Sequence, residues 1–309
     1  MSSTPPSARP FLPRPALATG AAAMACILGG SGFVFMRLLV GETEPVTVAL
    51  MRNGLGAAIV LVVVALFVRV RMPWRDLLAV AAIGLALLGV FHWLATIALQ
   101  FTTSGRAAIV TTSMPFMTLA VGAVLGLERP TVQKIGGLAL AAGGVTWALW
   151  DDAGGHPGAW RGDLLMLLAA LIGATASVFA ARYVRRYPPM LVVAAGLTPA
   201  ALMLALGALA TGAPLVPAHL STEGWAAVVW LGTASSAGSY FLWYWALRHT
   251  TPTLVAVTVS LNPVTALTLG LLLLGEALTT GLVGGLALVI AGIVVANRPA
   301  AAVAAKAPA

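Results

Sequence analysis

The sequence of 309 residues has few charged side chains and a single cysteine. Asp, Glu, Lys and Arg make up 8% of the chain, whereas 60% of it is hydrophobic. Soluble proteins carry about 25% charged residues, so this chain lacks the means to cover a water-facing surface and is predicted to be an integral membrane protein. Cys26 lies inside the first apolar segment, where it is expected to pack as a small side chain, and no disulfide framework exists.

Groups of catalytic or metal-ligating residues are also missing. The sequence has no His-x-x-x-His pair and no Gly-x-Ser-x-Gly turn, and its four histidines are scattered: His92, His156, His219 and His249. An intramembrane enzyme needs a clustered nucleophile and base, or metal ligands at helical spacing. We therefore predict no catalytic residue, no metal site and no cofactor. No Asp or Glu lies near the middle of an apolar segment, so a carboxylate proton relay has no obvious position.

The net charge of +8 is spread over short loops between apolar segments. This placement indicates a membrane-topology signal and argues against a nucleic-acid partner. With the N-terminus inside, thirteen basic residues fall on the cytoplasmic side and three on the outer side, so both termini are predicted to be cytoplasmic. Ten segments have the roughly 20 apolar residues that a spanning helix needs. They are residues 16–37, 46–68, 76–99, 105–126, 131–150, 163–183, 190–211, 223–247, 253–274 and 280–297.

The chain contains two copies of one sequence. Residues 98–144 align with residues 246–292 at an offset of 148 without a gap, and seventeen of the 47 positions are identical. The first two spans of each half also correspond, at an offset of 144. Because each half has an odd number of spans, the second copy is inverted in the membrane. The predicted fold is an all-α integral membrane protein with ten transmembrane helices in two inverted five-helix repeats.

These boundaries divide the chain into five parts. The predicted parts are a disordered cytoplasmic tail (1–15), a first repeat (16–150), an outer linker (151–162), a second repeat (163–298) and a short cytoplasmic tail (299–309). The N-terminal tail leads into a full-length span, so no cleaved signal peptide is expected.

Pro115 and Pro263 match across the repeat, and each lies near the middle of its span. Proline removes a backbone donor and clashes with the carbonyl four residues earlier, so both spans are predicted to be interrupted there. Two interpretations stay open, namely a polar pocket at the membrane midplane or a packed kink satisfied by its own hydroxyls. The polar residues around the prolines are Thr111, Thr112, Ser113, Thr258, Ser260 and Asn262.

The third and eighth spans carry a second polar pattern. His92, Thr96 and Gln100 follow one another at helical spacing, and the matching positions in the second copy include Tyr240 and Tyr244. Ser236 and Trp243 lie on the same segment. Inversion of the copies predicts that His92 and Tyr240 lie at opposite depths, as contacts at the two ends of one path. The alternative for the aromatic residues is an interfacial belt.

Arg52 is the one basic residue firmly inside a predicted span, about 10 Å below its outer edge. It is expected either to meet a substrate carboxylate or to extend outward toward Glu42 or Glu44. Its repeat counterpart is Gly196. Ser31 lies in a run of small residues in the first span, which close helix approach explains without a ligand.

Glu128 and Glu276 also match across the repeat. Each follows a span by a few residues, so it is expected to stabilise the N-terminus of the fifth or the tenth span. A role in ion coupling is the alternative.

The chain resembles the EamA-type families of the drug/metabolite transporter superfamily over about residues 16–298. The resemblance rests on residues 98–104 (ALQFTTS) with Pro115, 126–129 (GLER), 135–138 (IGGL), 246–251 (ALRHTT), 262–263 (NP), 275–276 (GE) and 284–285 (GG). It implies ten helices, an inner-membrane location and export of amino acids or related metabolites by alternating access. It also implies a cavity surrounded by the first four helices of each half, with the fifth and tenth helices outside it.

The predicted function is therefore secondary export of small metabolites, above all amino acids, including aromatic or apolar ones. The alternatives are sugars, nucleotide-linked metabolites or cationic drugs, or a passive facilitator. The expected partners are a small-molecule substrate and the lipid bilayer, and a monomeric state is compatible with the sequence.

Overall fold

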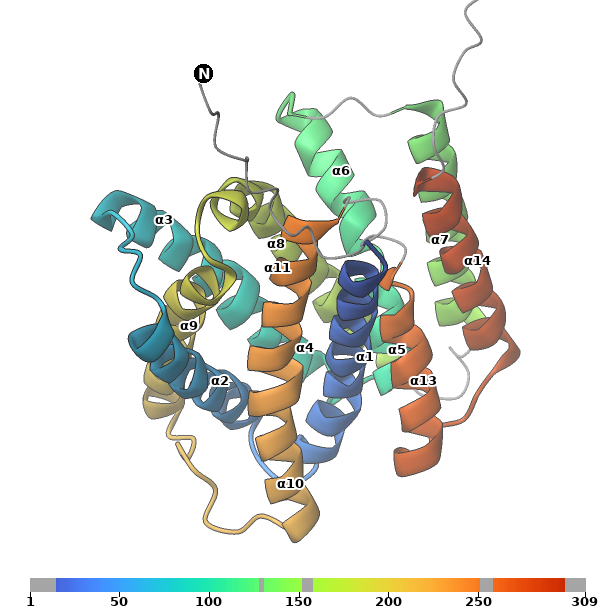
Figure 1. The fold of residues 1–309 in the computed structure, drawn as a ribbon. Helices are drawn as coiled ribbons and strands as arrows, with labels where there is room; N and C mark the ends of the chain where they lie inside the picture. The colour runs from blue at the N-terminus through green and yellow to red at the C-terminus, as the bar shows by residue number, and fades with distance from the viewer. Residues whose placement is uncertain (1–14, 128–130, 152–157, 251–257, 298–309) are drawn as a thin grey trace, which may run out of the picture.

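The computed structural model describes residues 15–127, 131–151, 158–250 and 258–297, and nearly all of these residues are helical (Figure 1). The uninterrupted helices are α1 (Pro15–Leu39), α2 (Pro45–Phe67), α7 (Val132–Asp151), α8 (Ala159–Arg186), α9 (Pro189–Thr211) and α14 (Thr280–Asn297). The third span consists of α3 (Trp74–Gly84), η1 (Leu85–Val90) and α4 (Phe91–Ala98), and the fourth of α5 (Ser104–Thr111) and α6 (Met114–Val124). The eighth consists of α10 (Thr222–Trp230), η2 (Leu231–Gly238) and α11 (Ser239–His249), and α13 (Leu261–Leu274) belongs to the ninth.

These elements confirm the predicted all-helical membrane fold. Six helical segments are long and apolar enough to cross a bilayer, and α13 and α14 are shorter apolar helices. Both tails predicted from the sequence, apart from Pro15 at the start of α1, lie outside the described residues. Pro45 and Pro189 stand in the first turn of α2 and α9, where the missing N–H of proline costs nothing.

The third and eighth spans each contain a π-helix, η1 and η2, at matching positions of the two copies. In a π-helix the backbone bonds run to the fifth residue, and the segment is wider than an α-helix. Such segments are rare and are common at functional sites. The repeat has therefore preserved an irregularity near the centre of the molecule.

The first helix of each repeat packs against the other repeat. Helix α1 of the first repeat contacts η2, α11 and α13 of the second, whereas α8 of the second repeat contacts η1, α4 and α6 of the first. A methyl group on Gly30 of α1 would collide with the backbone of Asn262, and one on Gly173 of α8 would come within 2.8 Å of the Met114 side chain. Each helix break is thus covered by the first helix of the other repeat.

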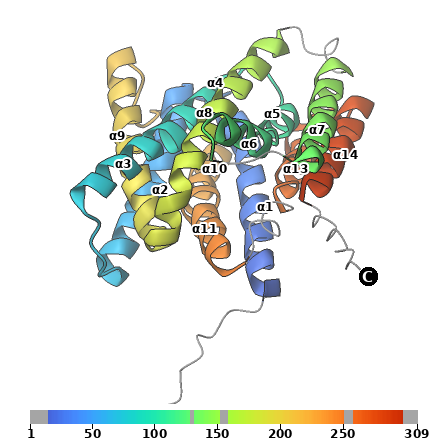
Figure 2. The same cartoon turned by 90° about the horizontal axis from the view of Figure 1, so that it is seen from above.

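Helices α7 and α14 lie side by side at one edge of the bundle (Figures 1 and 2). A methyl group on Gly137 would lie 2.5 Å from the Gly292 carbonyl oxygen, and one on Gly285 would lie 2.5 Å from that of Gly144. The offset of 148 between the copies relates Gly137 to Gly285 and Gly144 to Gly292, so the two contacts are equivalent. This reciprocity is the packing expected of an inverted duplication.

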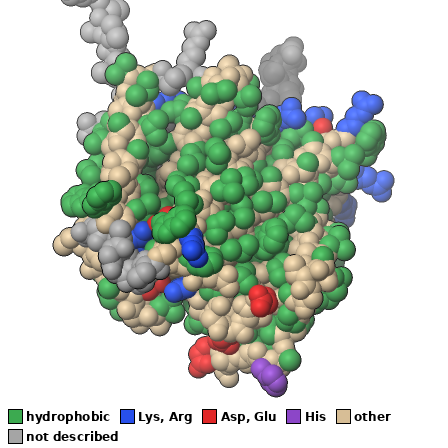
Figure 3. Space-filling model, turned by 180° about the vertical axis from the view of Figure 1, so that it is seen from behind, with side chains coloured by type: hydrophobic (Ala, Val, Ile, Leu, Met, Phe, Trp, Pro, Cys, Tyr) green, Lys and Arg blue, Asp and Glu red, His purple; other side chains and the backbone are tan. Residues whose placement is uncertain are grey.

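The outer surface is apolar around the middle of the molecule. Figure 3 shows a band of hydrophobic side chains between an end where Lys and Arg side chains gather and an end with acidic side chains and a histidine. Large side chains such as Phe67, Val124 and Leu206 are exposed in this way. Their exposure fits a lipid-facing surface.

Candidate functional site

His92 of α4 and Tyr240 of α11 meet at the centre of the bundle. The His92 Nε2 atom lies 2.9 Å from the Tyr240 hydroxyl, and His92 Nδ1 lies 2.8 Å from the carbonyl oxygen of Leu88. A carbonyl only accepts, so Nδ1 carries the proton and the hydroxyl donates to Nε2 of a neutral imidazole. Because the two residues are counterparts in the repeat, their contact lies on the pseudo-twofold axis. The expectation that they lie at opposite depths was wrong.

Thr96 extends this cluster, whereas Gln100 does not belong to it. The Thr96 hydroxyl donates to the carbonyl oxygen of His92 at 2.6 Å, and the side chain is fully buried. Helix α4 ends at Ala98, and the turn that follows leaves Gln100 exposed. The predicted polar stripe therefore stops after Thr96.

Arg52 is buried in the same region, with only 5% of its surface exposed. Its Nη1 lies 3.2 Å from the sulfur of Met36, its Nη2 donates to the carbonyl oxygen of Ser235 at 3.5 Å, and the guanidinium lies beside the Tyr240 hydroxyl. Within the described ranges, no carboxylate pairs with it. Outward extension toward Glu42 or Glu44 was thus a wrong expectation, since the side chain stays in the core.

Asn53 and Ser235 belong to the cluster but were missed by the sequence reasoning. Asn53 Nδ2 donates to the Leu88 carbonyl oxygen of η1 at 2.5 Å, so this oxygen accepts from both Asn53 and His92. Ser235 and Ser236 of η2 are fully buried, and their hydroxyls have no hydrogen-bond partner in the part of the chain that the structure describes. The sequence offered one indication of their role, which is that Asn53 and Ser235 are the chain neighbours of the predicted site residues Arg52 and Ser236.

Both predicted helix breaks are present. Helix α5 ends at Thr111 and α6 begins at Met114, with Pro115 in its first turn. The hydroxyls of Thr111 and Ser113 donate to carbonyls three residues earlier, at 2.8 and 2.7 Å. This geometry favours a packed kink in the first repeat.

The break in the second repeat differs from the first. Helix α13 begins at Leu261, directly after Ser260, and Pro263 is buried. Here the Asn262 Oδ1 atom is buried without a hydrogen-bond partner among the described residues. Residues 253–257 of the predicted ninth span lie outside the described residues.

The remaining candidates face protein. Ser31 accepts a hydrogen bond from the Trp230 indole at 2.8 Å and donates to the carbonyl oxygen of Leu28, so it joins α1 to α10. Trp243 is half-buried and packs against Ala22 and Ala246. Tyr244 is buried beside a cavity of about 20 Å³, which is also lined by Leu88, Gly196 and Tyr183. A space of this size holds about one water molecule.

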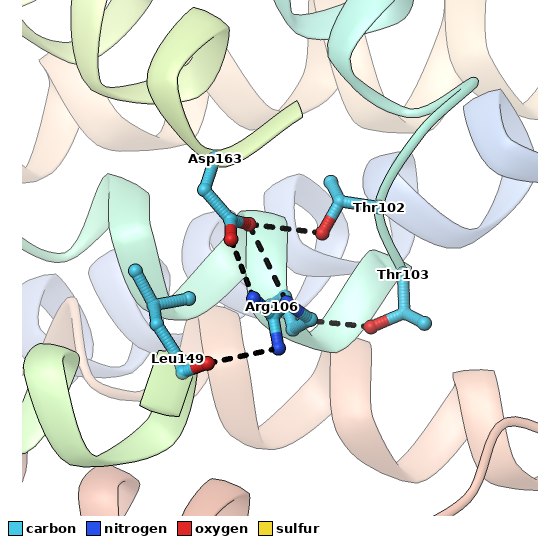
Figure 4. Close-up of polar contacts among 5 residues, drawn as sticks. All are labelled: Thr102, Thr103, Arg106, Leu149 and Asp163. Carbon is cyan, nitrogen blue, oxygen red and sulfur yellow. Dashed lines mark hydrogen bonds and ion pairs between the residues drawn. The ribbon is translucent and has the colours of Figure 1, made fainter. Parts of the chain in front are cut away.

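A buried ion pair closes the bundle at the end where Glu42 lies, called here the Glu42 end. Arg106 of α5 pairs with Asp163 of α8, and Arg106 Nη1 also donates to the Leu149 carbonyl oxygen of α7 (Figure 4). Asp163 accepts a further hydrogen bond from Thr102 at 3.0 Å (Figure 4). Nothing in the sequence pattern had paired Arg106 with Asp163. The two residues hold α5, α7 and α8 together.

Two further carboxylates bind backbone at the Glu42 end. Glu42 accepts from the Ser221 N–H and hydroxyl at 2.8 and 2.7 Å. Glu276 accepts from the Ser104 N–H at 2.9 Å and from its hydroxyl at 2.6 Å. Glu276 thus stabilises the N-terminus of α5, and the expectation that it serves the tenth span was wrong. Glu128 lies outside the described residues.

A different set of contacts closes the opposite end, called here the Arg186 end. Asp76 in the first turn of α3 pairs with Arg186 at 3.0 Å and accepts a hydrogen bond from the Tyr187 hydroxyl. This hydrogen bond raises the pKa of Tyr187 above its ordinary value. Arg186 is the repeat counterpart of Glu42. Loops at equivalent positions of the two repeats therefore close both ends of the bundle. Glu42 binds Ser221 at one end, and Asp76 binds Arg186 and Tyr187 at the other.

An apolar shell, two interrupted spans and a polar cluster on an inverted-repeat axis define a multi-pass membrane transporter. The model of the EamA-like transporter family matches residues 17–150 and again residues 160–298. The chain belongs to this family, whose members are transporters and not enzymes.

Individual proteins agree with this assignment. An uncharacterised inner membrane transporter of Escherichia coli, YedA, is 28% identical over 82% of this chain and 81% of its own length. A probable amino-acid metabolite efflux pump of Salmonella typhimurium is 29% identical over 62% of this chain and 66% of its own. A solved crystal structure with 22% identity superposes with a TM-score of 0.68 over 91% of this chain and 96% of that chain, which shows the shared fold.

Proposed function

We propose that this protein is a secondary transporter that exports small metabolites, above all amino acids, by alternating access through the polar cluster. The contact between His92 and Tyr240 carries the proposal, because a site on the pseudo-twofold axis is equally related to both faces of the membrane. The Salmonella efflux pump, whose name includes amino-acid metabolites, supports the substrate class. The unpaired Arg52 disfavours cationic drugs, because like charges repel strongly in a core of low polarity.

The proposed binding set consists of the residues predicted from the sequence in the cluster, at the two helix breaks and on the neighbouring helices, without the exposed Gln100. Its members are Ser31, Arg52, His92, Thr96, Thr111, Ser113, Pro115, Ser236, Tyr240, Trp243, Tyr244, Ser260, Asn262 and Pro263. The proposed repeats keep their boundaries at 16–150 and 163–298, with a linker of 151–162 between them. The substrate and the bilayer are the proposed partners.

The proposed location is the inner membrane, with both termini in the cytoplasm. The gathering of Lys and Arg side chains at the end opposite the histidine supports this orientation (Figure 3). A C-terminal green fluorescent protein should fluoresce in this arrangement, and a C-terminal alkaline phosphatase should be inactive. The opposite result would reverse the orientation.

The substrate class is tested by counterflow into proteoliposomes. Vesicles preloaded with one amino acid should take up the labelled amino acid with saturable kinetics, and empty liposomes should not. Unlabelled amino acids should compete, whereas sugars, nucleotides and cationic dyes should not. A complete lack of saturable amino-acid flux would overturn the proposal, and flux that rises linearly with concentration would favour a passive facilitator.

Alternating access is tested by locking the Glu42 end. In a Cys26→Ala background, the pair Glu42→Cys and Ser221→Cys replaces a hydrogen-bonded contact that joins the loop after α1 to the start of α10. Oxidation should stop counterflow and a reductant should restore it, while each single cysteine variant stays active under oxidant. Undiminished flux through the oxidised pair would contradict a path that opens at this end.

A further inference from the structure

Arg52 is a buried cation whose charge no described side chain balances. Its neighbours are a thioether, a backbone carbonyl and a phenol, and its Nε atom has no hydrogen-bond partner among the described residues. Burying an unpaired guanidinium in a membrane protein is costly, and such residues usually face a substrate or ion pathway. The charge is also confined to one repeat, since Gly196 occupies the matching position, packed against Gly84.

Two further donors without partners among the described residues lie on η2, the segment that accepts a hydrogen bond from Arg52. The hydroxyls of Ser235 and Ser236 are buried in η2, and the Arg52 Nη2 atom donates to the Ser235 carbonyl oxygen. A methyl group added to Gly32 would collide with the Ser235 hydroxyl and lie 3.4 Å from Arg52 Nη1. The Ser235 hydroxyl and the Arg52 guanidinium thus approach the same point beside the Gly32 backbone of α1.

Ser236 is close to a second glycine on the helix that carries Arg52. A methyl group on Gly56 would lie 3.2 Å from the Ser236 hydroxyl. Glycines at positions 32 and 56 therefore let η2 approach α1 and α2 closely, which brings one cation and two hydroxyl donors into one region. A planar anion with two oxygen atoms matches such a set, because a guanidinium donates to both oxygens of a carboxylate and hydroxyls donate to the remaining lone pairs.

We infer that Arg52, Ser235 and Ser236 form the subsite that binds the carboxylate group of the substrate. The inference rests on the proposed function and narrows it, since transported solutes must then carry a carboxylate. One cation balances one carboxylate, so monocarboxylates such as neutral amino acids fit, whereas dicarboxylates leave a second charge unpaired. The aromatic ring of Tyr240 and the side chain of Met36 provide the adjoining apolar surface.

The test compares leucine with leucinamide, which differ only in the carboxylate. Purified protein in detergent is assayed for thermal stabilisation by each compound, and proteoliposomes are assayed for competition with labelled leucine. Leucine should stabilise the wild-type protein and compete, and leucinamide should do neither at tenfold higher concentration. A parallel series with and without added sodium chloride determines whether an inorganic anion occupies the subsite.

The variants separate binding from folding. Ser235→Ala and Ser236→Ala each remove one donor and should weaken leucine binding by about threefold to tenfold. Arg52→Gln should weaken it by about tenfold or more. Ser239→Ala is the matched control, because this buried hydroxyl already donates to the Ala25 carbonyl oxygen, at 2.9 Å, and lies outside the subsite. Leucine binding by Ser239→Ala should equal that of the wild type.

The outcomes distinguish the two proposals. Saturable transport with equal competition by leucine and leucinamide would overturn the carboxylate subsite and leave the transporter function intact. The same conclusion follows if chloride competes as well as leucine does. If no amino acid is transported, the proposed function fails, and the thermal comparison of leucine and leucinamide still decides whether the subsite binds a carboxylate.

Discussion

The Nε2 atom of His92 and the hydroxyl oxygen of Tyr240 lie 2.9 Å apart, although 148 positions separate the two residues in the chain. The same number separates the two copies of the repeat. A residue touches its own counterpart only on the symmetry axis, so this hydrogen bond marks the centre about which the two halves are inverted. The copies have diverged there into a donor and an acceptor, which lets the pair bond directly.

Replacing Tyr240 by Phe should destabilise the protein, because it leaves the His92 Nε2 atom as a buried acceptor without a donor. The expected loss is about 1 kcal/mol, the usual scale for hydrogen bonds between membrane helices. Unfolding of the purified protein in detergent measures it. Tyr244→Phe is the control, since the described part of the chain shows no hydrogen bond from the Tyr244 hydroxyl. Equal losses in the two variants would contradict the assignment.

Asp163→Asn should be among the most damaging single substitutions. It removes the carboxylate charge that faces Arg106, which is only 2% exposed, at a cost of about 3–5 kcal/mol. The thermal midpoint and the expression level both report the loss. Exposed Arg161, two residues earlier, is the control, and Arg161→Gln should change stability by less than about 0.5 kcal/mol. The double variant Arg106→Met with Asp163→Leu should be more stable than Asp163→Asn alone, and the reverse order would argue against a charge effect.

Two neighbouring glycines of α7 should respond very differently to leucine. A side chain on Gly144 meets the Gly285 carbonyl oxygen at 2.6 Å, so Gly144→Leu should cost about 1–3 kcal/mol through overpacking. Gly143 faces open space, and Gly143→Leu should be neutral or stabilising because leucine favours helix. Thermal unfolding of both variants provides the comparison. Gly285→Leu should reproduce the loss, and indifference of all three sites would refute the close α7–α14 contact.

The contribution of Tyr187 to stability should depend on pH in the alkaline range. Its hydrogen bond to Asp76 raises its pKa, so the protonated phenol is favoured in the folded protein. The stabilisation is fully present below the unfolded pKa of about 10 and is lost as pH rises through the folded pKa. Unfolding from pH 7 to 11 should therefore show a constant deficit for Tyr187→Phe up to about pH 9, which shrinks above it. In an Asp76→Asn background this pH dependence should disappear, and its persistence would assign it to another group.

Several elements of the fold followed from the sequence because their causes are local. Proline at positions 115 and 263 removes a backbone donor and clashes with the preceding turn, so both breaks could be placed. Apolar length fixes the spans, and an odd number of spans per repeat fixes the inversion. The buried ion pair of Arg106 and Asp163 had no such cause, since the two residues come from different helices and read as loop charges. The π-helices η1 and η2 were not predicted either, because their side chains are typical of α-helices.

The sequence by itself determined the membrane environment, the helices, the duplication and its inversion, since each depends on composition, periodicity or the comparison of one half with the other. Tertiary structure alone decided which polar residues meet. It joined His92 to Tyr240, turned Arg52 inward toward η2 and directed Glu276 to α5 instead of α14. Helical periodicity determines the face of the helix on which a side chain lies. Which neighbouring helix packs against that face depends on how closely glycines allow the two backbones to approach.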